Sequence, residues 1–233
     1  GASRWRAFQV PALRPPLVQY SGRSMVARGG VFALLRGVLG QGREYGWVTI
    51  KTLFTQKPGR VDLLVGKLLA LLVAVLVMVL AVFAVDATAS FVIAAVDGKG
   101  GGFPPAIDLA KGIASLWLAY TFFAVFGFML ATLFQQSAMA IGLGLAYTIL
   151  IEGIIFSILR NVGGDTVKQV QSYFPIANIG YLSASFGAAI PAALRRTFAK
   201  PYADANHAVL FLLVYIAVFA VVAAVFVRRR DVT

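Results

Sequence analysis

Glu152 is the residue whose type and position most suggest chemistry in this chain. It is the only charged side chain in four apolar segments, 68–85, 113–134, 138–159 and 208–227. A carboxylate is costly to place in lipid, so Glu152 should face protein or water and find a partner there. Two roles fit: a contact on a substrate or proton path, or a hydrogen bond that packs helices together, which is the more common role.

The sequence patterns of familiar catalytic and metal sites are absent. The chain has no cysteine and one histidine, His207, so it cannot build a thiolate or multi-histidine metal site by itself. No phosphate-binding GxxxxGK[ST] loop, GxSxG turn, HExxH helix or paired carboxylate pattern occurs. We therefore expect a non-enzymatic chain that binds no metal or cofactor, with His207 as an interfacial residue.

The apolar segments predict an all-α, polytopic membrane bundle. About 20 helical residues cross the roughly 30 Å hydrocarbon core of a bilayer. Hydrophobic residues make up 60% of the chain and the mean hydropathy is +0.84, above the roughly 45–50% apolar content of soluble domains. Four strong helices are expected near 63–85, 113–134, 138–159 and 208–227. A weaker one is expected near 25–42, where Arg28 and Arg36 must face protein or reach the membrane surface.

The chain is expected to consist of a basic, Pro-containing segment, residues 1–24, and a single membrane domain, residues 25–233, whose helices are joined by polar connections. Residues 44–56 place Trp47, Ile50 and Phe54 on one side of a helix and polar residues on the other, which predicts an amphipathic interfacial helix. Only three residues, 135–137, separate two of the spans, so those helices should form an antiparallel hairpin. The longest connection, 160–207, is broken by Pro175 and Gly180 and should contain short interfacial or re-entrant pieces.

Basic residues next to the span ends predict the orientation. The net charge is +12. Because most of the basic residues lie next to apolar segments, we expect them to contact lipid phosphates rather than nucleic acid. One side carries the larger share close to span ends, which indicates that this side and the C-terminus are cytoplasmic. These residues are Arg43, Lys51, Lys57, Arg60, Lys67 and Arg228 to Arg230.

The polar run Gly42 to Arg60, followed by Leu63 to Ala70, resembles the ABC-2 type permease family of ABC transporters. That family commonly shows an E-Y-G-x-x-T-x-K-T segment, a P-x-R turn and a G-K-x-L-A entry into the next helix. The resemblance continues at Leu133 to Ala138, at Ala146 to Thr148 with Glu152, and at Arg228 to Asp231. Against the family's usual six helices, the first helix is missing here and the second is unusually basic, so the chain is expected to begin in the loop after the first.

The resemblance implies a multi-pass protein of a bacterial or archaeal cell membrane, surrounded by lipid. Two permease subunits, identical or different, would pair, and separate cytoplasmic ATPase subunits would bind ATP and Mg²⁺. Residues 44–56 would be a coupling helix that enters the ATPase, with the hairpin turn as a second contact. The implied contact residues are Glu44, Tyr45, Gly46, Thr49, Lys51, Thr52, Thr55, Pro58, Arg60, Phe134, Gln135, Gln136 and Ser137.

The expected function is therefore that of a permease subunit, with export as the direction that the resemblance implies. Two alternatives stay open. A structural or accessory subunit of a larger membrane complex would scaffold without moving a substrate, and it would not co-purify with an ATPase. An ion-coupled carrier would bind a proton or cation at Glu152, and its transport would persist after ATP depletion.

Overall fold

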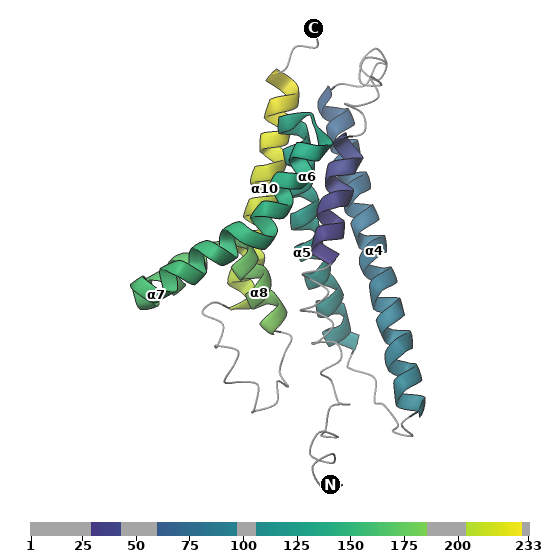
Figure 1. The fold of residues 1–233 in the computed structure, drawn as a ribbon. Coiled ribbons are helices and arrows are strands. Elements are labelled where there is room, and N and C mark those ends of the chain that lie inside the picture. Colours follow the sequence, from purple (N-terminus) through teal and green to yellow (C-terminus); the bar gives the residue numbers. More distant parts are fainter. Residues whose placement is uncertain (1–28, 43–59, 97–105, 186–203, 230–233) are drawn as a thin grey trace.

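The computed structural model describes residues 29–42, 60–96, 106–185 and 204–229, and every structural statement below concerns these ranges. All of their regular structure is helical, and no strand occurs among them. After a first helix, residues 29–42, the elements are α4 (Arg60–Val96), α5 (Ala106–Phe134), α6 (Ser137–Ala146), the π-helical turn η1 (Tyr147–Ile151), α7 (Glu152–Gln171), α8 (Pro175–Ser185) and α10 (Ala205–Arg229) (Figure 1).

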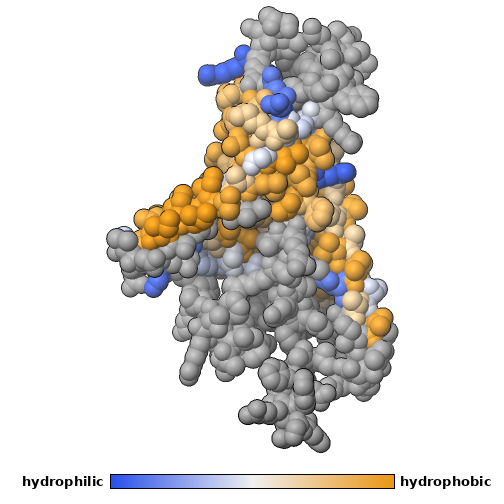
Figure 2. Space-filling model, viewed as in Figure 1, coloured by the Kyte–Doolittle hydropathy of each residue, from blue (hydrophilic) through white to orange (hydrophobic). Residues whose placement is uncertain are grey.

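Three helices are long and apolar enough to cross a membrane. They are Asp62–Ala89 within α4, Ala106–Phe134 and Ala205–Arg229. A broad apolar surface covers the bundle that they form (Figure 2). The all-helical fold and the membrane character expected from the sequence are therefore both found, and three of the four strong spans appear as single long helices.

The fourth expected span, 138–159, is not one regular helix. Its first part is α6, which has 10 residues and is about 15 Å long, half the thickness of the hydrocarbon core. The chain continues through η1 into α7, so the path is helical throughout but changes its winding at Tyr147. A π-helical turn adds a residue to the helical repeat and is a frequent site of bending.

Within the expected weak N-terminal span, residues 29–42 form a helix that packs closely against α5. It is not among the helices that are long and apolar enough to cross a membrane. A Cβ atom added to Gly37 would overlap the backbone carbonyl of Ala124, and one added to Gly127 would lie 2.5 Å from the carbonyl oxygen of Leu34. Glycines at the crossing thus let the two backbones approach, as small residues do in membrane helix pairs. Arg36 is exposed and points away from this contact, while Arg28 lies outside the described residues.

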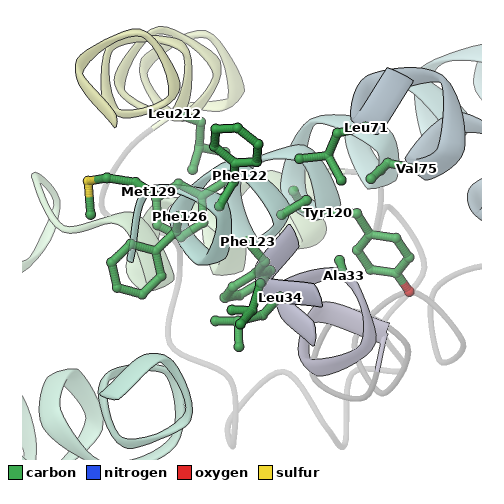
Figure 3. Packing of buried hydrophobic residues seen from close by; sticks show 14 of the residues in the cluster. Ala33, Leu34, Leu71, Val75, Tyr120, Phe122, Phe123, Phe126, Met129 and Leu212 are labelled. Carbon is green, nitrogen blue, oxygen red and sulfur yellow. The ribbon is translucent and has the colours of Figure 1, made fainter. Parts of the chain in front are cut away.

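α5 is the centre of the bundle. Its residues from Ala119 to Thr132 are all buried, because helix 29–42, α4 and α10 pack on different sides of it. Figure 3 shows Leu34 of helix 29–42 beside Phe123, Leu71 and Val75 reaching in from α4, and Leu212 of α10 next to Phe122. Trp117 of α5 also donates its indole N–H to the carbonyl oxygen of Leu72 in α4, over 3.2 Å.

α7 must fold back on itself. A straight helix of 20 residues would hold Glu152 and Gln171 about 28 Å apart. Yet the rings of Phe156 and Phe174 are 4.8 Å apart, and the Glu152 carboxylate bonds to the first turn of α8. The short 172–174 turn cannot cover such a gap, so the chain returns within α7. We call residues 152–171 the α7 arm; it extends sideways from the bundle (Figure 1).

The long connection expected over 160–207 begins as helix. The α7 arm continues to Gln171, and α8 follows after a turn of three residues. Pro175 does interrupt the path, since it opens α8, where its missing N–H costs nothing. Gly180 does not interrupt it, because it lies inside α8. Residues 1–24, the amphipathic segment 44–56 and residues 186–203 lie outside the described ranges.

Candidate functional site

The α5–α6 turn holds most of the described residues among the implied ATPase contacts. α5 ends at Phe134, and α6 begins at Ser137. Gln135 adopts a left-handed backbone with φ 53°, and its N–H still donates to the carbonyl of Ala131 over 2.9 Å. Phe134, Gln135 and Gln136 are exposed. This tight turn is the hairpin expected from the sequence, and it presents three side chains at its tip.

The end of helix 29–42 and the beginning of α4 lie beside this turn. A Cβ atom on Gly42 would overlap Oγ of Ser137, so helix 29–42 ends against the start of α6. Lys67 in the second turn of α4 donates through Nζ to Oε1 of Gln41 over 3.4 Å. The end of helix 29–42, the beginning of α4 and the α5–α6 turn thus meet at one end of the bundle (Figure 1).

We call this end the turn end. α10 also finishes there, with Arg228 and Arg229 exposed. With Lys67, these arginines outnumber the exposed acid Asp62 of α4 at this end. Arg60 opens α4 at the turn end. The remaining implied contacts, Glu44, Tyr45, Gly46, Thr49, Lys51, Thr52, Thr55 and Pro58, lie outside the described residues.

Glu152 lies in a second polar cluster, on the other side of η1. Its side chain is 3% exposed. Oε1 accepts the N–H of Ala177 over 2.8 Å, and Oε2 accepts the N–H of Ile176 over 3.1 Å and the hydroxyl of Tyr147 over 3.3 Å. The two amides belong to the first turn of α8, where free N–H groups and the helix dipole favour a negative charge. Glu152 therefore fastens α8 to the start of the α7 arm.

The 172–174 turn between α7 and α8 is held from two directions. Asn178 of α8 donates through Nδ2 to the carbonyls of Ser172 and Phe174, over 2.7 and 2.8 Å. On the α10 side, Nε2 of His207 lies 3.0 Å from the Ser172 carbonyl, and the Tyr215 hydroxyl donates to the Tyr173 carbonyl over 3.1 Å. The turn is thus tied to α10 as well as to its own helix.

Aromatic rings separate this polar cluster from the core of α5. Tyr147 packs on Phe126 with ring centroids 5.2 Å apart, and Phe219 of α10 packs on the same Phe126 ring at 5.2 Å. Phe122 extends the contact toward Tyr215 at 6.2 Å. The four phenylalanines in this part of α5, Phe122, Phe123, Phe126 and Phe128, are all buried. They pack helices together in this structure.

The chemistry open to Glu152 is limited by these partners. Both carboxylate oxygens already accept hydrogen bonds, and three donors surround them. Among the described residues, no group of three His, Asp or Glu side chains could hold a metal ion. These hydrogen bonds are those expected of the packing role, and the substrate or proton contact at Glu152 stays a prediction.

The sequence carries no signal that marks Ser172 or Asn178. Both are polar residues in a segment that carries no charge pattern, and their partners are backbone atoms, which leave no trace in the sequence. The contact between Tyr147 and Glu152 is also hard to foresee. Their spacing of five residues suits a π turn, whereas residues three or four apart face each other on an α-helix.

Comparison with known proteins identifies a family. A family model described as "Protein of unknown function (DUF2705)" matches residues 30–233. The chain belongs to this family. The DUF2705 region starts within helix 29–42 and therefore includes both the turn end and the Glu152 cluster. No curated protein and no solved structure matches the chain.

Proposed function

We propose that this chain is the membrane-spanning permease subunit of an ATP-driven ABC transporter and that it works in export. The observation that supports the permease role most strongly is that the end of helix 29–42, the beginning of α4 and the α5–α6 turn lie together at the turn end. Gly42 and Arg60 flank the segment that the resemblance identifies as a coupling helix, and the α5–α6 turn is the second implied contact. These stretches are far apart in sequence, and a docking ATPase would need them on one side.

In this proposal the chain performs no catalysis. ATP and Mg²⁺ bind to the partner ATPase subunits, and nucleotide-driven closure moves the coupling segments of two paired permease subunits. The membrane helices then alternate between two arrangements that open a path to either side of the membrane. The tight contact of helix 29–42 with α5 supports this role, because closely packed helices move together as a rigid unit.

The proposal is tested by reversing one charge in the implied coupling helix. Lys51→Glu should uncouple ATP hydrolysis from transport. In vesicles that contain the permease and the co-purified ATPase, we expect ATP hydrolysis to continue while transport falls at least tenfold. The control is Lys111→Glu, the same reversal at an exposed residue in the first turns of α5, far along the helix from the turn end. Normal transport by the Lys51 variant would contradict the assignment of the segment.

Two further measurements separate the alternatives. An accessory subunit would purify without an ATPase in comparable amount, whereas the proposal requires roughly equal numbers of ATPase and permease subunits. A carrier that binds its coupling ion at Glu152 would continue to transport after ATP depletion, whereas the proposed transporter would stop.

A further inference from the structure

The α7 arm has an outgoing limb, which leaves the bundle and includes residues 154–159, and a returning limb, which leads back to α8 and includes residues 166–170. On the outgoing limb the exposed side chains are apolar: Ile154, Ile155, Ile158 and Leu159. On the returning limb, Thr166, Lys168 and Gln169 are exposed and polar, and Val170, near the end of the limb, is exposed and apolar. The exposed residues described on the outgoing limb are thus apolar, whereas those on the returning limb are mostly polar, which is the division expected of a segment between an apolar and an aqueous medium.

The apolar limb is continuous with the apolar surface of the bundle. In Figure 2 the side of the arm that looks toward the turn end is apolar, and the same colouring runs from it onto the helices behind. A lipid surface would meet the bundle and the arm together. This continuity favours lipid over any partner that would cover the arm alone.

The 172–174 turn at the base of the arm lies toward the far edge of the three candidate spans. Counting from the turn end, their apolar stretches finish at Asp86 in α4, Lys111 in α5 and Asp204 before α10. Each stretch is about 33–36 Å long at a rise of 1.5 Å per residue, which is close to the thickness of the hydrocarbon core of a bilayer. The 172–174 turn at the base of the arm lies beside His207 in the first turn of α10, and so at this edge.

Aromatic residues mark the same level. The rings of Tyr173, His207 and Phe211 contact one another, with Tyr173 and Phe211 5.3 Å apart and His207 and Phe211 4.4 Å apart. Tyr173 is also exposed. Amphipathic rings gather at membrane–water interfaces, where the apolar part meets lipid and the polar atoms meet water.

We infer that the α7 arm lies in the plane of the membrane at the end of the bundle away from the turn end, with lipid as its occupant. The outgoing limb rests on the acyl chains, and the returning limb faces headgroups and water. Glu152 fixes the base of the arm by holding α8 against it. This inference does not depend on the ABC transporter proposal, since it concerns only where the arm sits.

Spin labels on single cysteines test the inference directly. The chain has no native cysteine, so Ile154→Cys, Ile158→Cys and Gln169→Cys each give one labelled site. The protein is reconstituted in vesicles of phosphatidylethanolamine and phosphatidylglycerol, three to one. Collision with apolar O₂ and with a water-soluble nickel chelate then reports depth. Val73→Cys, exposed near the middle of the span Asp62–Ala89, and Asp108→Cys, exposed at the start of α5, are the deep and aqueous controls.

The expected result is a shallow lipid position for the outgoing limb. Labels at 154 and 158 should favour O₂ over the nickel chelate and lie about 5–10 Å below the headgroups, above the Val73 control, while the Gln169 label matches Asp108. Nickel access at 158 as high as at the Asp108 control would overturn the inference, because the outgoing limb would then be in water. The inference would also be overturned if the labels at 154 and 158 were immobile and their spectra were broadened by the same label on a neighbouring molecule. A second copy of the chain, rather than lipid, would then cover the outgoing limb.

Discussion

A buried carboxylate in an apolar segment needs donors, and Glu152 obtains them from the backbone of another helix. The first turn of α8 offers two free amide groups, and Tyr147 adds a hydroxyl. A hydrogen bond to a charged group contributes about 1.5–3 kcal/mol, and leaving buried donors unpaired costs a similar amount. Glu152 is therefore expected to matter for stability whether or not it takes part in the proposed transport.

Replacing Glu152 with glutamine should weaken the α7–α8 contact without changing the size of the side chain. The amide oxygen can accept one of the two backbone N–H groups, but the amide nitrogen faces the other. We expect a loss of about 2 kcal/mol, which lowers the midpoint of thermal unfolding in detergent by roughly 4–8 °C.

Asp108→Asn is the matched control for this change. Asp108 is also an acid in the first turn of a helix, but it is exposed, so only a dipole contribution of about 0.3–1 kcal/mol is removed. Equal shifts of the two variants would show that Glu152 gains nothing from burial against α8.

At the scale of elements, the crossing of helix 29–42 over α5 depends on the absence of a side chain at Gly37. Gly37→Ala should lower the unfolding midpoint, because the new Cβ overlaps the backbone carbonyl of Ala124 and the helices must separate. Gly40→Ala in the same helix is the control. Nothing lies within 4 Å of its Cβ position, and alanine favours helix over glycine by up to about 1 kcal/mol. A stabilised Gly37→Ala variant would contradict the observed crossing.

The elements that could be predicted from the sequence are those set by local composition. Uninterrupted apolar residues are sufficient to find α5, α10 and most of α4, and the three residues 135–137 leave room only for a hairpin. The change of winding at Tyr147 has no such local signal, since the apolar sequence continues through it. The fold-back of the α7 arm is equally hidden, because it depends on contacts between Glu152 and α8, more than 20 residues away.

In the candidate sites, too, local polarity is visible in the sequence, whereas the packing between helices is not. The hairpin turn could be located by sequence because its polar residues interrupt an apolar run. The proximity of the hairpin turn to Gly42 and Lys67 could not be predicted from the sequence, because this proximity follows from how helix 29–42 and α4 pack around α5. Glu152 stood out by its charge, whereas its partners on α8 are backbone amides that any residue other than proline would provide.

For the molecule as a whole, the arrangement of helix ends predicts which residues share a side of the membrane. Gln136→Cys in the α5–α6 turn and Arg229→Cys at the end of α10 should react with a membrane-impermeant maleimide from the same side. The basic flanks predict that this side is cytoplasmic, so labelling should occur in inverted vesicles and not in intact cells.

Asp108→Cys, at the opposite end of α5, should show the reverse pattern. It is exposed and lies beyond the far edge of the span, so it should react in intact cells. Labelling of Gln136 and Arg229 from different sides would contradict the bundle, because it would require α5 and α10 to end on opposite membrane faces.

The hydrogen bond from Trp117 to Leu72 has a practical consequence for observing the molecule at work. Trp117 is one of three tryptophans in the chain, beside Trp5 and Trp47, and its indole bridges the two longest helices. Indole emission responds to hydrogen bonding and to the polarity around the ring. A chain that keeps Trp117 alone, with phenylalanine at the other two positions, would carry an intrinsic fluorophore at the α4–α5 contact, which would register sliding between these helices without any added dye.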